Sequence, residues 1–317
     1  MEPIHIACAC DNNYVPHCGA LIMSIFENNK NNNIDVNVVT DGFSDENIAK
    51  LKQVERHYRQ KINIVKIDIS RLANFPIEKS FNGYINLSTY YRLLLPDLFP
   101  NYDKILYLDC DIIVRGDLGQ LWNTDISKYS IAGIHDSTSM VVTGPQRLCY
   151  PETESYYNAG VGLYNLDYLR KIDFVSKAFE FIKSNKEKIK FQDQDVLNGV
   201  LHGTFKQISV KWNLMEVFLL KKPLIESEMM ADLSSCITSP SVIHYTNVLK
   251  PWFKECNHPY KSEYWKYIHM SPWKNVKAQY KYNFTKRTAL YVKRFIKSAL
   301  ACFNLYNNSF AHLKLQD

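Results

Sequence analysis

The chain has 317 residues, of which 46% are hydrophobic and 13% aromatic, so it can bury a sizeable core and is not expected to be disordered. Its formal charge of +6 is concentrated at one end. Residues 274–317 contain nine Lys or Arg and one acidic residue, a net of +8, which leaves −2 for the first 273 residues. A near-neutral body with a basic tail does not fit a uniformly basic nucleic-acid-binding protein, so we expect no nucleic-acid partner.

The first part of the chain alternates apolar runs with amphipathic segments. Strands are predicted at 4–10, 34–40 and 61–68, and helices between them at 15–29 and 44–58. Ser44, followed by acidic residues, is typical of a helix start. This β-α-β-α-β order predicts a parallel sheet with helices on both faces, which binds ligands at the carboxyl ends of its strands.

The middle of the chain adds further short elements. Residues 86–100 predict a short helix stopped by Pro96, and residues 103–114 predict a pair of strands broken around two aspartates. More strands are predicted at 129–136 and 241–247, and more helices at 174–189 and 194–203. The whole pattern therefore predicts an α/β protein.

Neither export nor a membrane span is indicated by the sequence. The N-terminal residues MEPIHIACAC lack the basic start and long apolar run of a signal peptide, and no apolar run approaches the roughly 20 residues of a membrane span. The eight cysteines include no CxxC pair, which disfavours a zinc ribbon. We expect a cytoplasmic protein whose thiols are reduced.

Asp109 and Asp111 interrupt the apolar run YLDCDIIV, although a buried carboxylate costs several kcal/mol unless a partner compensates it. Alternate residues of a strand share a face, so the two carboxylates are expected to project together, with Cys110 on the other face. Such a pair can share one hard divalent cation. Two other interpretations are a pair of buried, hydrogen-bonded aspartates and a phosphoaspartyl phosphatase. The phosphatase also requires a GDGxND-like acidic cluster, which the sequence lacks.

The sequence NLSTYYRLLLPDLFPNYDKILYLDCDIIVRGDLGQLW resembles the core of the family 8 retaining glycosyltransferases. That family includes bacterial lipopolysaccharide galactosyl- and glucosyltransferases and glycogenin. The resemblance continues, in the family's order, through ACDNNY at 9–14, YYNAGVGLYNL at 156–166, FQDQDVLNG at 191–199 and HYTNVLKPW at 244–252. It covers roughly residues 1–255. It implies a single Rossmann-like, nucleotide-sugar-binding domain of GT-A type, with a mixed, mainly parallel sheet and a basic C-terminal helical tail.

The resemblance also implies which residues hold the ligands. Asp109, Asp111 and His244 would bind Mn²⁺, with Mg²⁺ as the alternative ion. A UDP-hexose donor, carrying glucose or galactose, would contact Ala9, Asp11, Asn13, Tyr14, Arg92, Asp109, Cys110, Asp111, Asp136, Asn158, Ala159, Asn247 and Lys250. Taken alone, Asp11 to Asn13 could form only a turn. Family members usually have Gly where this chain has Asn247, a position close to the phosphates.

The catalytic roles implied by the resemblance fall on Gln194, Asp193 and Lys250. Lys250 would neutralise the departing diphosphate, and Gln194 would lie near the anomeric carbon. An amide is a poor nucleophile, so attack of the acceptor from the face that UDP leaves is favoured over a covalent intermediate. The expected acceptor is a glycan or glycolipid in lipopolysaccharide or capsule synthesis. Alternatives are a protein- or self-glucosylating transferase, or a catalytically silent UDP-sugar-binding protein.

The last segment is basic and amphipathic. Residues 288–306 place apolar side chains at helical spacing, with Lys293, Arg294 and Lys297 largely off that stripe. We therefore expect residues 1–270 to form the catalytic domain. Residues 271–317 are expected to form a tail that binds an anionic membrane surface, at the inner face of the cytoplasmic membrane. The alternative is a helix that packs on the body with a solvated basic face.

Overall fold

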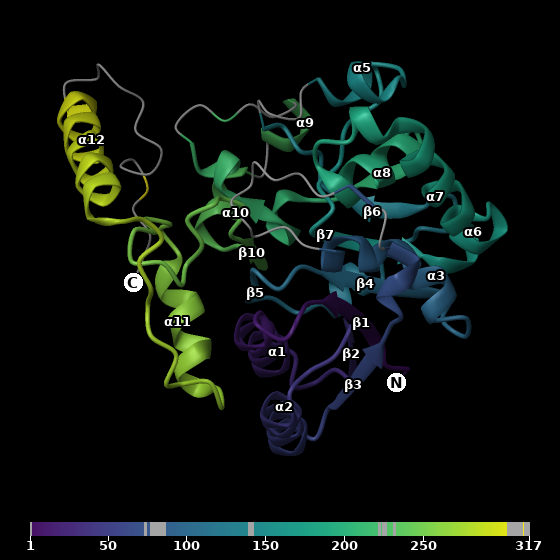
Figure 1. The fold of residues 1–317 in the computed structure, drawn as a ribbon, viewed down its shortest axis with the longest axis horizontal. Coiled ribbons are helices and arrows are strands. Elements are labelled where there is room, and N and C mark those ends of the chain that lie inside the picture. Colours follow the sequence, from purple (N-terminus) through teal and green to yellow (C-terminus); the bar gives the residue numbers. More distant parts are fainter. Residues whose placement is uncertain are drawn as a thin grey trace.

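The computed structural model describes residues 2–72, 75–76, 87–138, 143–220, 223, 227–230, 233–302 and 313. Its main sheet has seven strands in the order β3-β2-β1-β4-β7-β6-β8 (Figure 1). These strands are β1 (Ile4–Ala9), β2 (Ile34–Thr40), β3 (Lys61–Lys66), β4 (Lys104–Leu108), β6 (Ile131–Gly133), β7 (Val161–Asn165) and β8 (Phe205–Gln207). Strand β7 is antiparallel to β4 and β6, and the other pairs are parallel. The mixed, mainly parallel sheet that the resemblance implied is confirmed.

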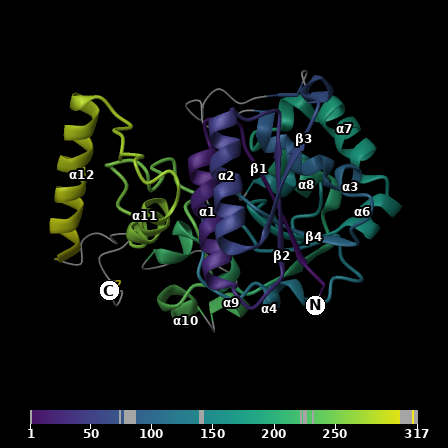
Figure 2. The ribbon, with the colours of Figure 1, turned by 90° about the horizontal axis from the view of Figure 1, so that it is seen from below.

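Helices cover both faces of this sheet, as the alternation predicted (Figure 2). One face carries α1 (Val15–Asn28) and α2 (Asp45–Tyr58), and the other carries α3 (Leu95–Leu98), α6 (Leu166–Lys171), α7 (Phe174–Asn185) and α8 (Gln192–Leu201). Each face buries its own hydrophobic core. The predicted start of α2 is confirmed, because the Ser44 side chain accepts a hydrogen bond from the Asn47 N–H at 3.3 Å.

A second, three-stranded sheet lies beside the carboxyl end of β4. It consists of β5 (Ile112–Val114), β10 (Val242–His244) and β9 (Leu214–Met215), in the order β5-β10-β9. The chain passes from the first sheet to the second through residues 109–111, which belong to a turn. The predicted break in the strand pair is therefore confirmed, but the expectation that both aspartates lie in a strand is wrong.

The segment that contains Pro96 also differs from its prediction. Residues Leu87–Leu94 form a 3₁₀ helix, and α3 begins at Leu95. Pro96 lies in the first turn of α3, where the missing N–H would have had no partner within the helix. The proline thus helps to start a helix rather than to stop one.

Shorter elements complete the described chain. They are the helices α4 (Gly119–Trp122), α5 (Gly144–Leu148), α9 (Ser227–Met230), α10 (Leu233–Thr238), α11 (Lys261–Met270) and α12 (Phe284–Cys302), and 3₁₀ helices at Ile69–Leu72, Lys186–Lys188, Val210–Trp212 and Glu216–Leu219. None of the helices in the described ranges is both long and apolar enough to cross a membrane.

The chain after α11 stays in contact with the body for a further stretch. Trp273 is buried against α1, where a Cβ added to Gly19 would lie 2.4 Å from its ring. The buried Glu255 carboxylate accepts hydrogen bonds from the backbone N–H groups of Lys281 and Tyr282. Helix α12 follows at the edge of the molecule, at the upper left of Figure 1, with α11 below it.

Candidate active site

Two aspartates and a histidine converge where the two sheets meet. Asp109 and Asp111 lie in the turn between β4 and β5, and His244 ends β10, where it pairs with Ile112. The His244 Nε2 atom is 3.8 Å from Asp109 Oδ2 and 3.3 Å from Asp111 Oδ1. One donor atom from each of the three residues lies within 4.8 Å of the others. The convergence expected of the carboxylates is confirmed, and the turn produces it.

The orientation of His244 suits a cation. Its Nδ1 atom is 2.9 Å from the side-chain oxygen of Asn213, which can only accept a hydrogen bond. A proton therefore resides on Nδ1, and Nε2 faces the two carboxylates. Two carboxylates and a neutral imidazole are ligands of divalent metals such as Mn²⁺. The three residues can hold a divalent cation, as the resemblance implied.

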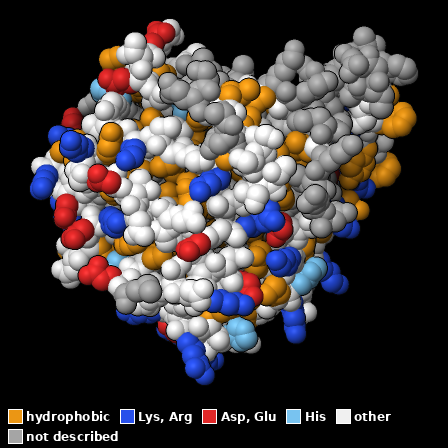
Figure 3. Space-filling view, turned by 180° about the vertical axis from the view of Figure 1, so that it is seen from behind, with side chains coloured by type: hydrophobic (Ala, Val, Ile, Leu, Met, Phe, Trp, Pro, Cys, Tyr) orange, Lys and Arg blue, Asp and Glu red, His pale blue; other side chains and the backbone are white. Residues whose placement is uncertain are grey.

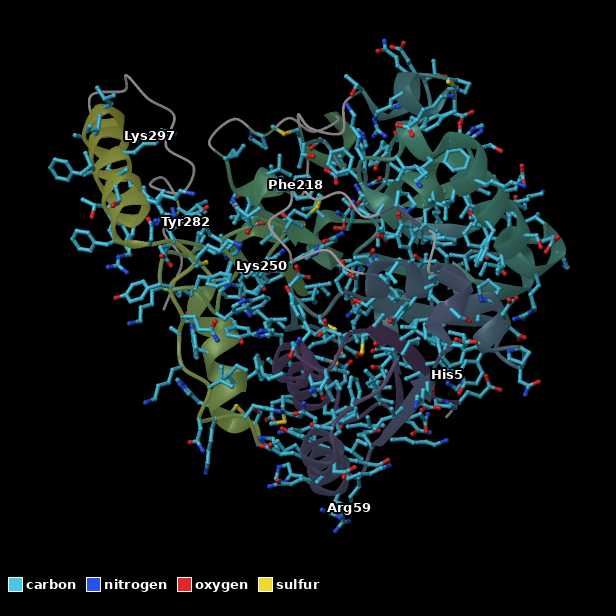
Figure 4. All side chains as sticks on the ribbon, in the orientation of Figure 1. His5, Arg59, Phe218, Lys250, Tyr282 and Lys297 are labelled. Atoms are coloured by element: carbon cyan, nitrogen blue, oxygen red, sulfur yellow. The ribbon has the colours of Figure 1, made fainter. Side chains whose placement is uncertain are left out.

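Two basic side chains lie against the carboxylates. Lys250 Nζ donates to Asp111 Oδ2 at 2.6 Å and to the Tyr245 carbonyl at 2.6 Å. Although burial opposes ionisation of Asp111, the neighbouring Lys250 and His244 outweigh it and hold the pKa of that carboxyl well below its usual range. Asp111 is therefore ionised at neutral pH and can bind a cation. Lys250 lies near the centre of the molecule, far from Lys297 on α12 (Figure 4).

Arg92 joins the turn to helix α8. Its Nη2 atom donates to Asp109 Oδ1 at 2.7 Å, its Nε atom lies 2.8 Å from Asp193 Oδ2, and its Nη1 atom donates to the Ala159 carbonyl at 2.5 Å. The guanidinium is buried, and its pKa is raised by Asp109 and Asp193 despite its desolvation. One arginine thus fixes two carboxylates of the site and the backbone at Ala159.

Burial raises the pKa of Asp193 to about 7, with Arg92 opposing the shift and Asp109 adding to it. In the unfolded chain this carboxyl has its ordinary pKa of 3.8. The folded protein therefore keeps the proton up to a higher pH than the unfolded chain does. In metal-free protein we expect the free energy of unfolding, relative to Asp193→Asn, to fall as pH rises from 5 to 6.5. The slope would be about 1.2 kcal/mol per pH unit. Urea unfolding of both proteins at the two pH values measures this, and parallel pH profiles would contradict it.

A polar network continues away from the cation site. Gln194 Oε1 accepts from the Ala159 N–H at 3.0 Å and from Asn158 Nδ2 at 3.2 Å, and Gln194 Nε2 donates to Asp136 Oδ2 at 3.1 Å. Asn158 Nδ2 also reaches Asp136 Oδ2 at 3.3 Å. The structure therefore brings four of the expected sugar-binding and catalytic residues together. Both ends of the Gln194 amide are engaged, which holds that side chain in place.

The residues expected to bind the nucleotide follow β1. Asp11 Oδ1 accepts from the backbone N–H groups of Asn13 and Tyr14, so the turn that the sequence allowed is present. The Cys110 thiol lies 3.5 Å from the Ala9 carbonyl, which ties the end of β1 to the aspartate turn. The Tyr14 ring makes a T-shaped contact with Trp252, two residues after Lys250. These contacts place the end of β1, the aspartate turn and the Lys250 loop side by side.

Asn247 is held in its loop without a left-handed backbone. Its N–H donates to Glu216 Oε1 and its side-chain oxygen accepts from the Leu249 N–H, each at 3.3 Å. Thr246 donates to the other oxygen of Glu216 at 2.5 Å. Asn247 is not among the positive-φ residues of the described chain. The loop conformation seen here therefore does not require the glycine that family members usually have.

The comparisons with known proteins agree with this geometry. A model of glycosyl transferase family 8 matches residues 5–256. The chain belongs to this family. A lipopolysaccharide 1,2-glucosyltransferase of Escherichia coli is 30% identical over 93% of this chain and 88% of its own length. A lipopolysaccharide 1,3-galactosyltransferase of Salmonella typhimurium is 27% identical over 86% of this chain and 80% of its own length.

Solved structures of the galactosyltransferase LgtC share the fold. LgtC in complex with donor and acceptor sugar analogs is 26% identical, with a TM-score of 0.76, over 85% of this chain and 96% of LgtC. An active-site mutant of LgtC, in which a glutamine is replaced by glutamate, matches with a TM-score of 0.77 and the same identity and coverage. The GT-A-type fold and the activity class, a hexosyltransferase, are thus confirmed for this family 8 chain.

Three residues of this glycosyltransferase site escaped the sequence analysis. Gly160 lies so close to the cation ligands that an added Cβ would be 2.2 Å from His244 Cε1 and 2.7 Å from Asp109 Oδ2. Asn213 orients His244, and Glu216 holds the loop at Asn247. Gly160 could have been noticed as a glycine within YYNAGVG. Asn213 and Glu216 stand in no motif, and only the pairing of β9 with β10 brings them to the site.

Proposed function

We propose that this family 8 transferase moves a hexose from a UDP-hexose to a glycan or glycolipid acceptor, with retention of the α configuration and with the help of a divalent cation. The observation that carries the proposal is the convergence of Asp109, Asp111 and His244 beside Lys250. This arrangement offers three cation ligands and a separate positive charge, which are the groups that a nucleotide diphosphate needs as it leaves.

The proposed cation is Mn²⁺, because one imidazole and two carboxylates suit it, and Mg²⁺ is the alternative. When bound, the cation would neutralise part of the charge that develops on the departing UDP. Lys250 Nζ now donates to Asp111 Oδ2 and would turn to the diphosphate when the donor binds. Arg92 keeps Asp109 in place from the opposite side.

The sugar would lie over the network of Asp136, Asn158 and Gln194, whose amide and carboxylate groups can bind its hydroxyls. In the proposed step the bond from the anomeric carbon to the diphosphate breaks, and the acceptor oxygen forms its bond on the same face. The acceptor proton passes to the diphosphate oxygen that leaves. The double hydrogen bond to Gln194 Oε1 supports a positioning role for this amide rather than a nucleophilic one.

The acceptor class is proposed from the relatives, which act on lipopolysaccharide and include both glucosyl- and galactosyltransferases. We propose a role in lipopolysaccharide or capsule synthesis. The test is a donor panel, UDP-glucose against UDP-galactose, with Mn²⁺, Mg²⁺ or EDTA. The expected result is Mn²⁺-dependent turnover of one donor and an α-linked product. A β-linked product would contradict retention, and a glycosyl adduct trapped on Gln194 or Asp193 would contradict same-face attack.

We further propose that α12 binds the cytoplasmic face of the membrane through its outward surface, as part of a tail that begins after residue 270. The half-buried positions of α12 are Arg287, Leu290, Arg294 and Lys297, at helical spacing of three or four. Arg294 donates to the Glu255 carbonyl at 2.6 Å and to Asn257 at 2.8 Å. The side of α12 that carries Arg287, Arg294 and Lys297 therefore faces the body.

The opposite surface of α12 is apolar and exposed. Phe295 is 76% and Phe284 73% exposed, and they are accompanied by Tyr291, Val292, Ile296 and Leu300. Apolar side chains gather at this edge of the molecule in Figure 3. Residues 303–306, which the sequence placed in the same helix, lie outside the described residues. A helix with this outward surface fits insertion into the headgroup region, with Lys286 and Lys293 near the anionic lipids.

We expect Phe295→Glu to weaken binding to phosphatidylglycerol-containing vesicles at least about tenfold, because burial of a Phe side chain is worth about 1.5–3 kcal/mol. Vesicle sedimentation measures the change. Ser262→Glu, which adds the same charge at an exposed position of α11, is the matched control and should bind like the wild type. Equal binding of all three proteins would contradict the membrane surface.

A further inference from the structure

Asn213 is fully buried and lies between the 3₁₀ helix Val210–Trp212 and strand β9. The two ends of its carboxamide contact different parts of the site. Its Oδ1 atom accepts from His244 Nδ1 at 2.9 Å, and its Nδ2 atom donates to Asn158 Oδ1 at 3.0 Å. This position therefore requires a side chain that accepts a hydrogen bond at one end and donates one at the other, as an amide does.

From Asn213 the hydrogen bonds continue into the sugar-binding network. Asn158 Oδ1 accepts a second hydrogen bond from the Gly160 N–H at 3.0 Å, so that its Nδ2 group must face Asp136 and Gln194. An unbroken series of hydrogen bonds thus runs from the imidazole of the cation site to the amide of Gln194.

We propose that Asn213 is a positioning residue that couples the cation site to the sugar-binding network, so that each favours binding at the other. The inference rests on the proposed function and extends it. Partners of metal-ligating histidines fix their tautomer and orientation, and their loss commonly lowers metal affinity by about 10- to 100-fold. Asn213 does this for His244 and, through the same amide, sets which way the Asn158 amide points.

Two substitutions separate the two contacts. Asn213→Asp keeps an oxygen that accepts from His244 but replaces the donor to Asn158 with a second acceptor. If the Asn158 amide keeps its orientation, its oxygen then faces the new carboxylate at position 213. If the amide turns over, its oxygen points at Asp136 and Gln194 instead. The sugar-binding network is disturbed in both cases, while His244 keeps its tautomer. Asn213→Leu, of similar size, removes both contacts.

The test uses the full chain and two ligands, with Mn²⁺ binding measured by EPR and UDP-hexose binding measured by titration at saturating Mn²⁺. We expect Asn213→Leu to weaken Mn²⁺ binding about 10- to 100-fold and donor binding as well. We expect Asn213→Asp to leave Mn²⁺ affinity within about threefold of the wild type, yet to weaken donor binding about tenfold or more. Thermal unfolding of both variants checks that they are folded.

Asn29→Leu is the matched control. Asn29 is also a buried amide that accepts at one end, from the Leu118 N–H, and donates at the other, to the Ile25 carbonyl, but it touches no residue of the site. The Asn29→Leu substitution should lower stability without changing either affinity.

Unchanged Mn²⁺ binding in Asn213→Leu, or equal losses of both affinities in the Asp and Leu variants, would overturn the coupling role. A wild-type protein that does not bind Mn²⁺ would instead overturn the cation site of the proposed function, and this inference with it.

Discussion

Asp111→Asn is expected to lower the rate of hexose transfer by roughly three orders of magnitude, because several kcal/mol of charge stabilisation depend on the cation, at 1.36 kcal/mol per factor of ten. The carboxylate offers one oxygen 3.3 Å from His244 Nε2 and the other 2.6 Å from Lys250 Nζ. An amide has similar volume but no charge, and its NH₂ group must point at one of these two nitrogen atoms. The cation would lose a ligand, and Lys250 would lose the partner that keeps it close.

The measurement is the initial rate of transfer, or of slow donor hydrolysis, over a titration of Mn²⁺. The expected outcome is a large loss that excess Mn²⁺ restores only in part. Asp117→Asn makes the same change of charge at an exposed residue after β5 and should keep wild-type activity. Full activity of Asp111→Asn in EDTA would contradict both the cation site and its role in transfer.

The first half of the main sheet was predictable because its information is local. Alternating apolar and polar segments specify β1, α1, β2, α2 and β3, and Ser44 marks the start of α2. The direction of β7 was not predictable, because a run such as VGLYN is equally compatible with parallel and antiparallel pairing. Strand β7 is inserted antiparallel between β4 and β6, and this connection brings Asn158 to Gly160 next to the aspartate turn.

The candidate site also contains some residues that could be predicted from the sequence and others that could not. Asp109, Asp111, His244 and Lys250 could be found because they stand in motifs, and the structure brings them together. The reason given for the convergence of the aspartates was nevertheless wrong. They meet in a turn whose shape depends on the Asp109 N–H donating to the Gly160 carbonyl, a contact between distant residues. Asn213 could not be predicted for a similar reason, because only the packing of β9 beside β10 brings it to His244.

Gly160→Ala is expected to lower activity by about 100-fold, the loss that a displacement of about 1 Å at a reacting site can cause. The added methyl group would lie 2.2 Å from His244 Cε1 and 2.7 Å from Asp109 Oδ2. Neither neighbour can easily move away. His244 is held by Asn213 behind it, and Asp109 is held by Arg92 at 2.7 Å and by the Gly160 carbonyl through its own N–H.

The strain must therefore appear as separation of the cation ligands, and Mn²⁺ affinity should fall together with the rate. Thermal unfolding should change less than these two quantities, because overpacking typically costs only about 1–3 kcal/mol. Gly133→Ala on the neighbouring strand β6 is the matched control, since its Cβ would meet its nearest atoms at 3.5 Å and 3.7 Å, an ordinary contact. Normal Mn²⁺ binding by Gly160→Ala would mean that the ligands can move apart and still hold the cation. The close approach of Gly160 would then have no part in shaping the site.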